Sequence, residues 1–200
     1  MRRRFDKLLV LDLDETLIHA SMFSQPWPHD FQVGLARAWK RPGVGRFLTI
    51  CFEWFHVGIW TSATRPYAGD VLGHLAGDPG RFSFVFTREH CLQKDIAELP
   101  GNFGNRDPAL GQPAPNAGWG SAGLGRIWVK DLCFLLERGQ SVESIIVVDD
   151  SPESWLGHQD NVVAVSKFKG DPADRELELL LPFLESLGQL PDIRAASQDR

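Results

Sequence analysis

Two pairs of closely spaced aspartates stand out because each follows directly on a short apolar run. Asp12 and Asp14 come after the run KLLVL, and Asp149 and Asp150 come after SIIVV. Carboxylates this close repel each other, so they need a bound cation or a shared proton. A hard divalent ion such as Mg²⁺, with oxygen ligands, meets this need where a phosphate must also be held. A helix cap is the alternative for the first pair and a turn that caps a helix for the second, but four converging carboxyl groups have little structural use without a metal.

Hydroxyl and cationic side chains that could hold a phosphoryl group lie between the two acidic pairs. Thr61 follows the apolar run VGIW, with Ser62 next to it, and offers a hydroxyl among backbone N–H groups. Lys130 in WVKDL could offset the charge of a phosphate and of Asp12. Arg88 in REHC is a candidate phosphate or substrate contact, with a solvated surface arginine as an equal alternative. Taken alone, none of these residues indicates a function.

The elements that would position these residues alternate along the chain between strand and helix. Short apolar runs predict strands at 7–13, 57–60, 82–86, 144–148 and 162–165. Apolar residues at helical spacing predict helices at 44–55, 66–75, 130–138 and 173–187. This alternation predicts an α/β fold, in which a doubly wound, Rossmann-like parallel sheet is flanked by helices and ligands bind at the carboxyl ends of the strands. Both acidic pairs fall at such ends, and the predicted helix 130–138 begins at Lys130.

The length and composition indicate one domain over residues 1–200, since 200 residues with 43% hydrophobic and 24% charged side chains can bury a core. Two segments break the alternation and are interpreted as insertions. Residues 23–39 are rich in aromatic residues and proline. Residues 98–126 are dominated by Gly, Pro, Asn and Ala, and a flexible surface loop is favoured there over a recognition or lid element.

The charge and the cysteines limit the classes of partner and location. A net charge of −5 argues against nucleic acid and against an anionic membrane as partners. The start of the chain resembles neither a signal peptide nor a membrane span, so we expect a cytoplasmic protein, or a nuclear one in a eukaryote. Cys51, Cys91 and Cys133 are odd in number and lie in apolar contexts, which predicts reduced, buried thiols. The histidines show no spacing typical of zinc ligands.

The order of the motifs is more informative than any one of them. DLDET, TSA, Lys130 and DDSP follow one another as do the four motifs of the haloacid dehalogenase superfamily of aspartate-nucleophile phosphotransferases. DLDETLIH, KRPGV, WTSA, REHC, VKDL and DDSP resemble one branch of it more closely. That branch contains the RNA polymerase II C-terminal-domain phosphatases and the small C-terminal-domain phosphatase-like proteins. The resemblance runs from about Lys7 to Leu187.

The resemblance implies a capless haloacid dehalogenase-like fold and a magnesium-dependent phosphatase that forms an aspartyl-phosphate. By position, Asp12 would be the nucleophile and a magnesium ligand. Asp14 would be the general acid and then the general base, with its backbone carbonyl on the metal. Asp150 would also ligate Mg²⁺, and Asp149 would orient Lys130 and the metal shell. The branch often has asparagine at the position of Asp150, so the aspartate here adds one negative charge.

By the same resemblance, four residues would hold the phosphate of the substrate: Thr61, Ser62, Lys130 and Arg88. Phosphoserine or phosphothreonine in a protein is the favoured substrate, because residues 23–39 are too short for a cap that would close the site. A phosphatase of small metabolites or of nucleic-acid 3′-phosphate ends is the alternative enzyme. A non-catalytic binding module of the same fold is the alternative outside enzymes.

Overall fold

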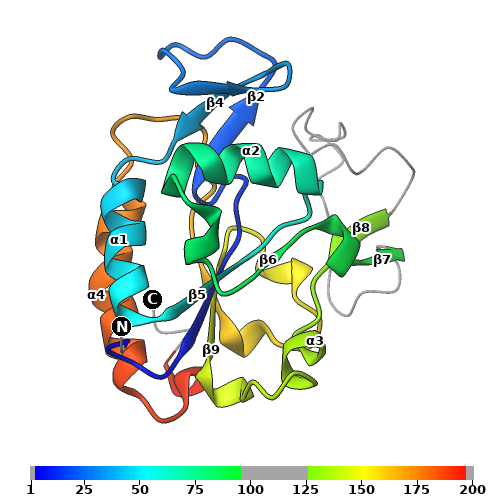
Figure 1. Ribbon diagram of the computed structural model, residues 1–200, viewed down its shortest axis with the longest axis vertical. Coiled ribbons are helices and arrows are strands. Elements are labelled where there is room, and N and C mark those ends of the chain that lie inside the picture. Colours follow the sequence, from blue (N-terminus) through cyan, green and yellow to red (C-terminus); the bar gives the residue numbers. More distant parts are fainter. Residues whose placement is uncertain (1–2, 96–125, 197–200) are drawn as a thin grey trace, which may run out of the picture.

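A five-stranded parallel sheet forms the centre of the protein (Figure 1). The computed structural model describes residues 3–95 and 126–196. The strand order is β10-β9-β1-β5-β6, and every neighbouring pair is parallel. The strands are β1 (Leu8–Leu11), β5 (His56–Trp60), β6 (Val85–Phe86), β9 (Ile145–Asp149) and β10 (Val162–Ala164). Since β1 lies in the middle and the chain winds outward on both sides, the predicted doubly wound α/β fold is confirmed.

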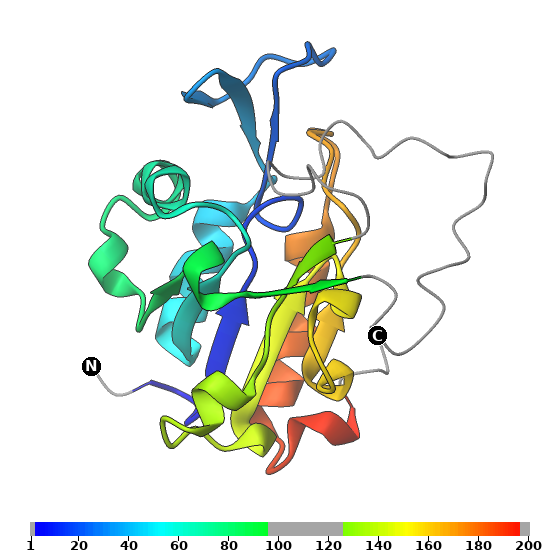
Figure 2. The same cartoon turned by 90° about the vertical axis from the view of Figure 1, so that its right-hand side faces the viewer.

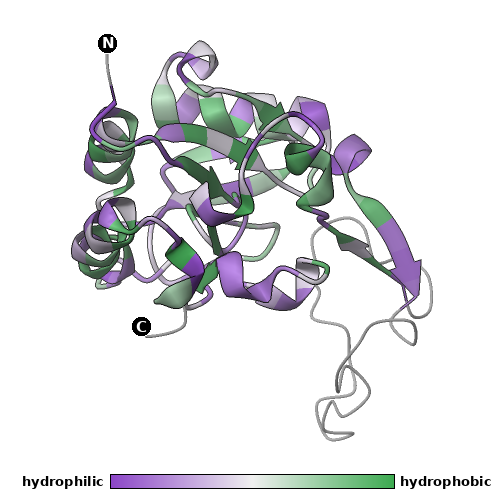
Figure 3. Ribbon diagram, turned by 90° about the horizontal axis from the view of Figure 1, so that it is seen from below, coloured by the Kyte–Doolittle hydropathy of each residue, from purple (hydrophilic) through white to green (hydrophobic). Residues whose placement is uncertain are grey.

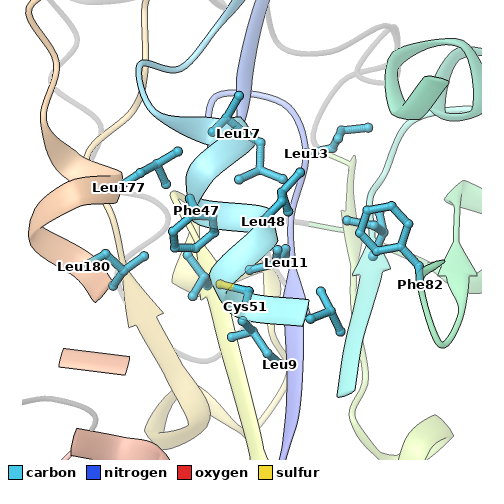
Figure 4. Packing of buried hydrophobic residues seen from close by; sticks show 14 of the residues in the cluster. Leu9, Leu11, Leu13, Leu17, Phe47, Leu48, Cys51, Phe82, Leu177 and Leu180 are labelled. Carbon is cyan, nitrogen blue, oxygen red and sulfur yellow. The ribbon is translucent and has the colours of Figure 1, made fainter. Parts of the chain in front are cut away.

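Helices and loops cover both faces of the sheet, which explains why its strands are apolar throughout. Successive side chains of a strand point to opposite faces. Leu9 and Leu11 therefore pack into the larger core, beneath helices α1 and α4 (Figure 4), whereas Leu8 and Val10 pack on the opposite face with Trp60. The helices are α1 (Val44–Trp54), α2 (Arg65–Ala76), α3 (Cys133–Leu136) and α4 (Glu176–Gln189).

The two helices α1 and α4 lie side by side and form one flank of the molecule (Figure 3). In the larger core α1 buries Phe47 and Leu48, and α4 buries Leu180 and Leu184. Within residues 3–95 and 126–196, none of the helices combines the length and the apolar character that a membrane crossing requires.

A small antiparallel sheet stands above the carboxyl ends of the parallel strands (Figure 2). Its order is β2-β4-β3, with β2 (Ile18–Ser21), β3 (Phe31–Val33) and β4 (Ala36–Lys40). The segment 23–39 that breaks the alternation in the sequence thus contains β3, most of β4 and the connections between the strands of this sheet. Since β2 begins four residues after Asp14, the small sheet adjoins the first acidic pair.

Three predicted elements begin three residues later in the structure than predicted. The strand predicted at 82–86 is only Val85–Phe86, and α4 begins at Glu176 rather than at 173. The helix predicted at 130–138 is wrong in its first turn, since only Cys133–Leu136 is helical. The carboxylate of Asp131 accepts the backbone N–H of Cys133 at 2.9 Å, which fixes the later start of the helix. Lys130 is extended instead and pairs with Trp155.

An antiparallel strand pair was not predicted. It consists of β7 (Leu92–Asp95) and β8 (Arg126–Val129), which border the second insertion. Most of that insertion, predicted at 98–126, lies outside the described residues. The polar residues of β7 and the short length of both strands leave no clear alternation in the sequence.

The expectation of three buried thiols is confirmed for Cys51 alone. All three are free, and Cys51 is buried in the core while Cys91 is half-buried. Cys133 is exposed, because the short helix α3 turns its first residue outward.

Candidate active site

Three adjacent strands bring the acidic and hydroxyl residues to one edge of the sheet. Asp12 follows β1, Thr61 follows β5, and Asp149 ends β9 with Asp150 next to it. β1 pairs with both β5 and β9, so that Leu11 lies beside Ile59 and Val148, the next-to-last residues of both neighbours. The carboxyl ends of parallel strands meet at the same edge, as in other doubly wound sheets.

Lys130 lies between two aspartates in the buried centre of this edge. Its Nζ donates to Asp12 Oδ1 and to Asp149 Oδ2, both at 2.7 Å, and the residue is 3% exposed. Burial alone would lower the pKa of Lys130, but the two carboxylates together raise it well above its ordinary value. The ammonium is therefore charged and holds the two strand ends together.

The backbone of Lys130 is fixed by the segment that carries Trp155. The Lys130 N–H donates to the carbonyl of Ser154 at 2.7 Å, and the Leu156 N–H donates to the carbonyl of Lys130 at 3.0 Å. The Lys130 Nζ also lies 5.1 Å from the centre of the Trp155 ring. This pairing explains how a residue outside the parallel sheet reaches its carboxyl edge.

Both carboxylate oxygens of Asp149 are engaged. Oδ2 accepts from Lys130 and from the Trp155 indole N–H at 2.8 Å, and Oδ1 accepts from the Ser151 backbone N–H at 2.8 Å. Asp149 thus orients Lys130, while Trp155 in turn orients Asp149. The part played by Trp155 could not be predicted from the sequence, since the contact depends on how the chain turns between Asp149 and Trp155.

Asp150 is connected to the loop that follows β1. The Thr16 hydroxyl donates to Asp150 Oδ1 and accepts the Asp150 backbone N–H, both at 3.2 Å. Lys167 lies 3.2 Å from Asp150 Oδ2 at the rim of the site. Asp150 raises the pKa of Lys167 against the opposite effect of burial. The extra negative charge of this aspartate therefore has a nearby cation.

A buried arginine anchors the same loop from behind. Arg41 forms an ion pair with Asp174, with two contacts of 2.9 Å, and donates to the backbone carbonyl of Thr16 at 3.1 Å. Glu15, within the loop, adopts a φ of 59°, a conformation that costs energy for a residue with a side chain. The loop is thus held in a bent form between the sheet and α4.

The donor set of the acidic cluster fits Mg²⁺. Carboxylate oxygens of Asp12, Asp149 and Asp150 lie within 4.8 Å of one another. Burial raises the pKa of Asp12 well above its ordinary value, and the charges of Asp149 and Asp150 act in the same direction against Lys130. A divalent cation among these hard oxygen ligands would favour the ionised carboxylates. Asp149 lies deepest at 1% exposed, whereas Asp12 is 7% exposed and Asp150 is half-buried, so Asp12 and Asp150 are the carboxylates that could bind the metal.

Asp14 lies beside a tyrosine from α2. The Tyr67 hydroxyl donates a hydrogen bond to Asp14 Oδ1. Burial and the charge of Glu15 raise the pKa of Asp14 to about 7, while the bond from Tyr67 acts in the opposite direction. A carboxyl group with this pKa can give and take a proton near neutral pH, as a general acid and base must. Tyr67 is a residue whose contact with Asp14 the sequence did not reveal.

Thr61, Ser62 and Arg88 form a second group at the end of β5. Thr61 is buried, and its Oγ1 accepts the Ala63 N–H at 3.1 Å, which leaves the hydroxyl proton for another acceptor. Arg88 Nε donates to the carbonyl of Ser62 at 2.7 Å, and its guanidinium lies 5.6 Å from the ring centre of Trp128. Of the four residues predicted to hold phosphate, Arg88 thus contacts Ser62, next to Thr61, while Lys130 contacts the two aspartates.

The fold and the arrangement of these residues define a haloacid dehalogenase-like protein, as the order of the motifs predicted. The family described as NLI interacting factor-like phosphatase matches residues 7–108 and 121–194. The chain belongs to this family of phosphatases.

Individual relatives agree with this assignment. The chain is 33% identical over 195 residues to an uncharacterized protein of Schizosaccharomyces pombe, covering 94% of this chain and 49% of that protein. It is 33% identical to a probable C-terminal domain small phosphatase of Dictyostelium discoideum, covering 94% and 53%. It is 31% identical to the human carboxy-terminal domain RNA polymerase II polypeptide A small phosphatase 1, covering 94% and 62%. The chain therefore spans about half the length of the curated relatives it matches.

Among solved structures, the RNA polymerase II CTD phosphatase Fcp1 has the same fold. The match has a TM-score of 0.51 at 19% identity and covers 90% of this chain and 48% of that one. At this identity the likeness supports the fold alone.

Proposed function

We propose that this protein is a magnesium-dependent phosphatase that hydrolyses phosphoserine or phosphothreonine in proteins through an aspartyl-phosphate on Asp12. The observation that carries the proposal is the buried Lys130 ammonium shared between Asp12 and Asp149 at 2.7 Å from each. It fixes the position of a carboxylate at the carboxyl edge of the sheet and places a positive charge where a phosphate would approach it.

The first half-reaction needs a nucleophile and a proton donor. An Asp12 carboxylate oxygen attacks phosphorus as the bond between phosphorus and the ester oxygen breaks, and Asp14 gives its proton to the leaving oxygen. The pKa of about 7 means that a large fraction of Asp14 carries this proton at neutral pH. Lys130 and the Thr61 hydroxyl are placed to donate to the phosphoryl oxygens.

The second half-reaction returns the protein to its starting state. Asp14, now ionised, takes a proton from a water molecule that attacks the phosphorus of the aspartyl-phosphate, and Asp12 is released as a carboxylate. Mg²⁺, held by Asp12, Asp150 and the backbone carbonyl of Asp14, would neutralise charge on the transferred group. Lys167 beside Asp150 offsets the additional charge that this aspartate brings to the site.

The relatives favour a protein as the substrate. Two of those that match the chain are named as small phosphatases of a C-terminal domain, one of them of RNA polymerase II. The small sheet β2-β4-β3 leaves no large cap between the first acidic pair and α1. Other relatives are named for the nuclear envelope, so the comparisons give no support to the expected cytoplasmic location.

A substrate panel tests this proposal. Purified protein is assayed with Mg²⁺ and with EDTA on p-nitrophenyl phosphate, phosphoserine and phosphothreonine peptides, sugar phosphates and a 3′-phosphorylated oligonucleotide. We expect turnover that requires Mg²⁺ and the highest kcat/KM on a phosphopeptide. Higher kcat/KM on a sugar phosphate or the oligonucleotide would assign the alternative enzyme. A folded protein without turnover on any of them would favour the binding module.

The pH dependence of turnover tests the part played by Tyr67. The Tyr67→Phe variant loses a hydrogen bond to the ionised form of Asp14, so the pKa of Asp14 rises above its present value of about 7. Protonated Asp14 then persists to higher pH, and the alkaline limb of the kcat/KM profile moves upward by roughly half to one pH unit. The profile is measured beside Ser186→Ala, which removes an exposed hydroxyl on α4. An unmoved limb would contradict the assignment of Asp14 as the acid.

A further inference from the structure

A second group of metal-ligating side chains lies apart from the acidic cluster. Asp131, Cys133 and His158 each place a ligand atom within 4.8 Å of the other two. Cys133 is exposed, and the other two residues are half-buried, so solvent and ions can reach the group. The sequence did not indicate it, because His158 follows Cys133 by 25 residues and lies in a different loop.

The distances within this group fit one small ion. Cys133 Sγ lies 3.9 Å from His158 Nε2. Thiolate and imidazole ligands of one tetrahedral zinc ion lie about 3.5 Å apart, given Zn–S and Zn–N bonds of about 2.3 and 2.0 Å. Asp131 Oδ1 accepts the Cys133 backbone N–H at 2.9 Å, which orients the carboxylate and leaves Oδ2 for the metal. The distance between Cys133 Sγ and His158 Nε2 would have to shorten by only a few tenths of an ångström to reach this value.

The backbone holds the two halves of the group in place. Asp131 directly follows Lys130. The backbone of Lys130 is hydrogen-bonded to the backbone of Ser154 and Leu156, a few residues before His158. His158 comes directly after Gly157, which has a φ of 66° and turns the chain toward α3. The two segments that carry the three ligands are therefore held together by backbone hydrogen bonds.

The types of ligand select the metal. A thiolate, an imidazole and a carboxylate suit zinc and similar borderline ions, whereas Mg²⁺ takes oxygen ligands alone. Three protein ligands leave a fourth position for water. From this geometry we propose that Asp131, Cys133 and His158 bind a zinc ion at a site separate from the acidic cluster. The proposal does not depend on the proposed phosphatase function.

A bound zinc ion would join the segments that support the buried lysine. Asp131 follows Lys130, and His158 follows the turn after Trp155, while both Lys130 and Trp155 donate to Asp149. Binding to the folded form alone would therefore stabilise the fold and the positions of these groups. We expect zinc to raise the thermal unfolding temperature of the protein.

Cobalt titration tests the site directly. The full chain is stripped with EDTA, kept reduced with a phosphine, and saturated with Mg²⁺ so that the acidic cluster is filled. Co²⁺ is then added. We expect a thiolate-to-cobalt charge-transfer band and the visible bands of tetrahedral Co²⁺ at one ion per chain, with both removed by one equivalent of Zn²⁺. An ion bound by carboxylates alone gives no such charge-transfer band.

Matched variants assign the ligands. We expect Cys133→Ser to remove the charge-transfer band and His158→Gln to weaken cobalt binding at least about tenfold. The controls Cys91→Ser and His56→Gln should keep the band. Zinc should raise the unfolding temperature of wild type but not of Cys133→Ser, whose exposed side chain leaves the core untouched. Absence of the band in wild type, or its persistence in Cys133→Ser, would overturn the proposal.

Discussion

Replacing Asp12 by asparagine is expected to lower kcat by about four orders of magnitude or more, because the amide cannot form the covalent intermediate. The side chains have nearly the same shape, and the amide oxygen can still accept from Lys130, which now contacts Asp12 at 2.7 Å. Steady-state turnover of p-nitrophenyl phosphate with Mg²⁺ measures the loss. The matched control Asp70→Asn changes an exposed aspartate on α2 and should keep full activity.

The same variant separates loss of chemistry from loss of fold. Burial and the charges of Asp149 and Asp150 disfavour the ionised form of Asp12, so asparagine removes an unfavourable charge and leaves Lys130 paired with Asp149. We expect thermal unfolding without Mg²⁺ at the wild-type temperature or above it. An Asp12→Asn protein that is folded and retains more than about 1% of the activity would rule out Asp12 as the nucleophile.

The sheet could be predicted because its strands are buried on both faces. Continuous apolar runs such as Leu8–Leu11 and 145–148 arise only where helices or loops cover each side, and they alternate with helical spacing along the chain. The small sheet and the pair β7 and β8 could not be predicted in the same way. Their strands are short and part-exposed, so their apolar residues follow neither the alternation typical of a strand nor the spacing typical of a helix.

The aspartates could be placed at one edge of the sheet because they end or follow buried strands, whereas Lys130 was assigned to the site by the order of the motifs. Their partners could not, since contacts such as Trp155 with Asp149 and Tyr67 with Asp14 depend on how loops and α2 fold back over the sheet edge. The extended backbone at Lys130 is a similar case. The apolar residues keep helical spacing on both sides of Lys130, which predicts a helix there. Two contacts keep this segment extended instead: the backbone pairing of Lys130 with Trp155, and the bond from the Cys133 N–H to Asp131.

Lys130→Met is expected to destabilise the protein most among the changes considered, by about 3–5 kcal/mol, because it leaves two buried carboxylates without their shared cation. Asp149 is 1% exposed and Asp12 is 7% exposed, so water cannot replace the lost ammonium. Methionine has a similar length and fills the space beside Trp155, which limits any cavity. Chemical denaturation without Mg²⁺ measures the change, and Lys169→Met, at an exposed lysine, is the control.

A double-mutant cycle shows whether charge is the cause. In an Asp12→Asn background one of the two unpaired charges is already gone, so Lys130→Met should destabilise this variant clearly less than it destabilises wild type. Mg²⁺ should stabilise Lys130→Met more than it stabilises wild type, since loss of the ammonium increases the negative potential at Asp12 and Asp150. If packing alone were lost, the two changes would be additive and Mg²⁺ would stabilise both proteins equally. Coupling in the cycle together with a larger magnesium effect would establish Lys130 as the cation that holds the acidic cluster together.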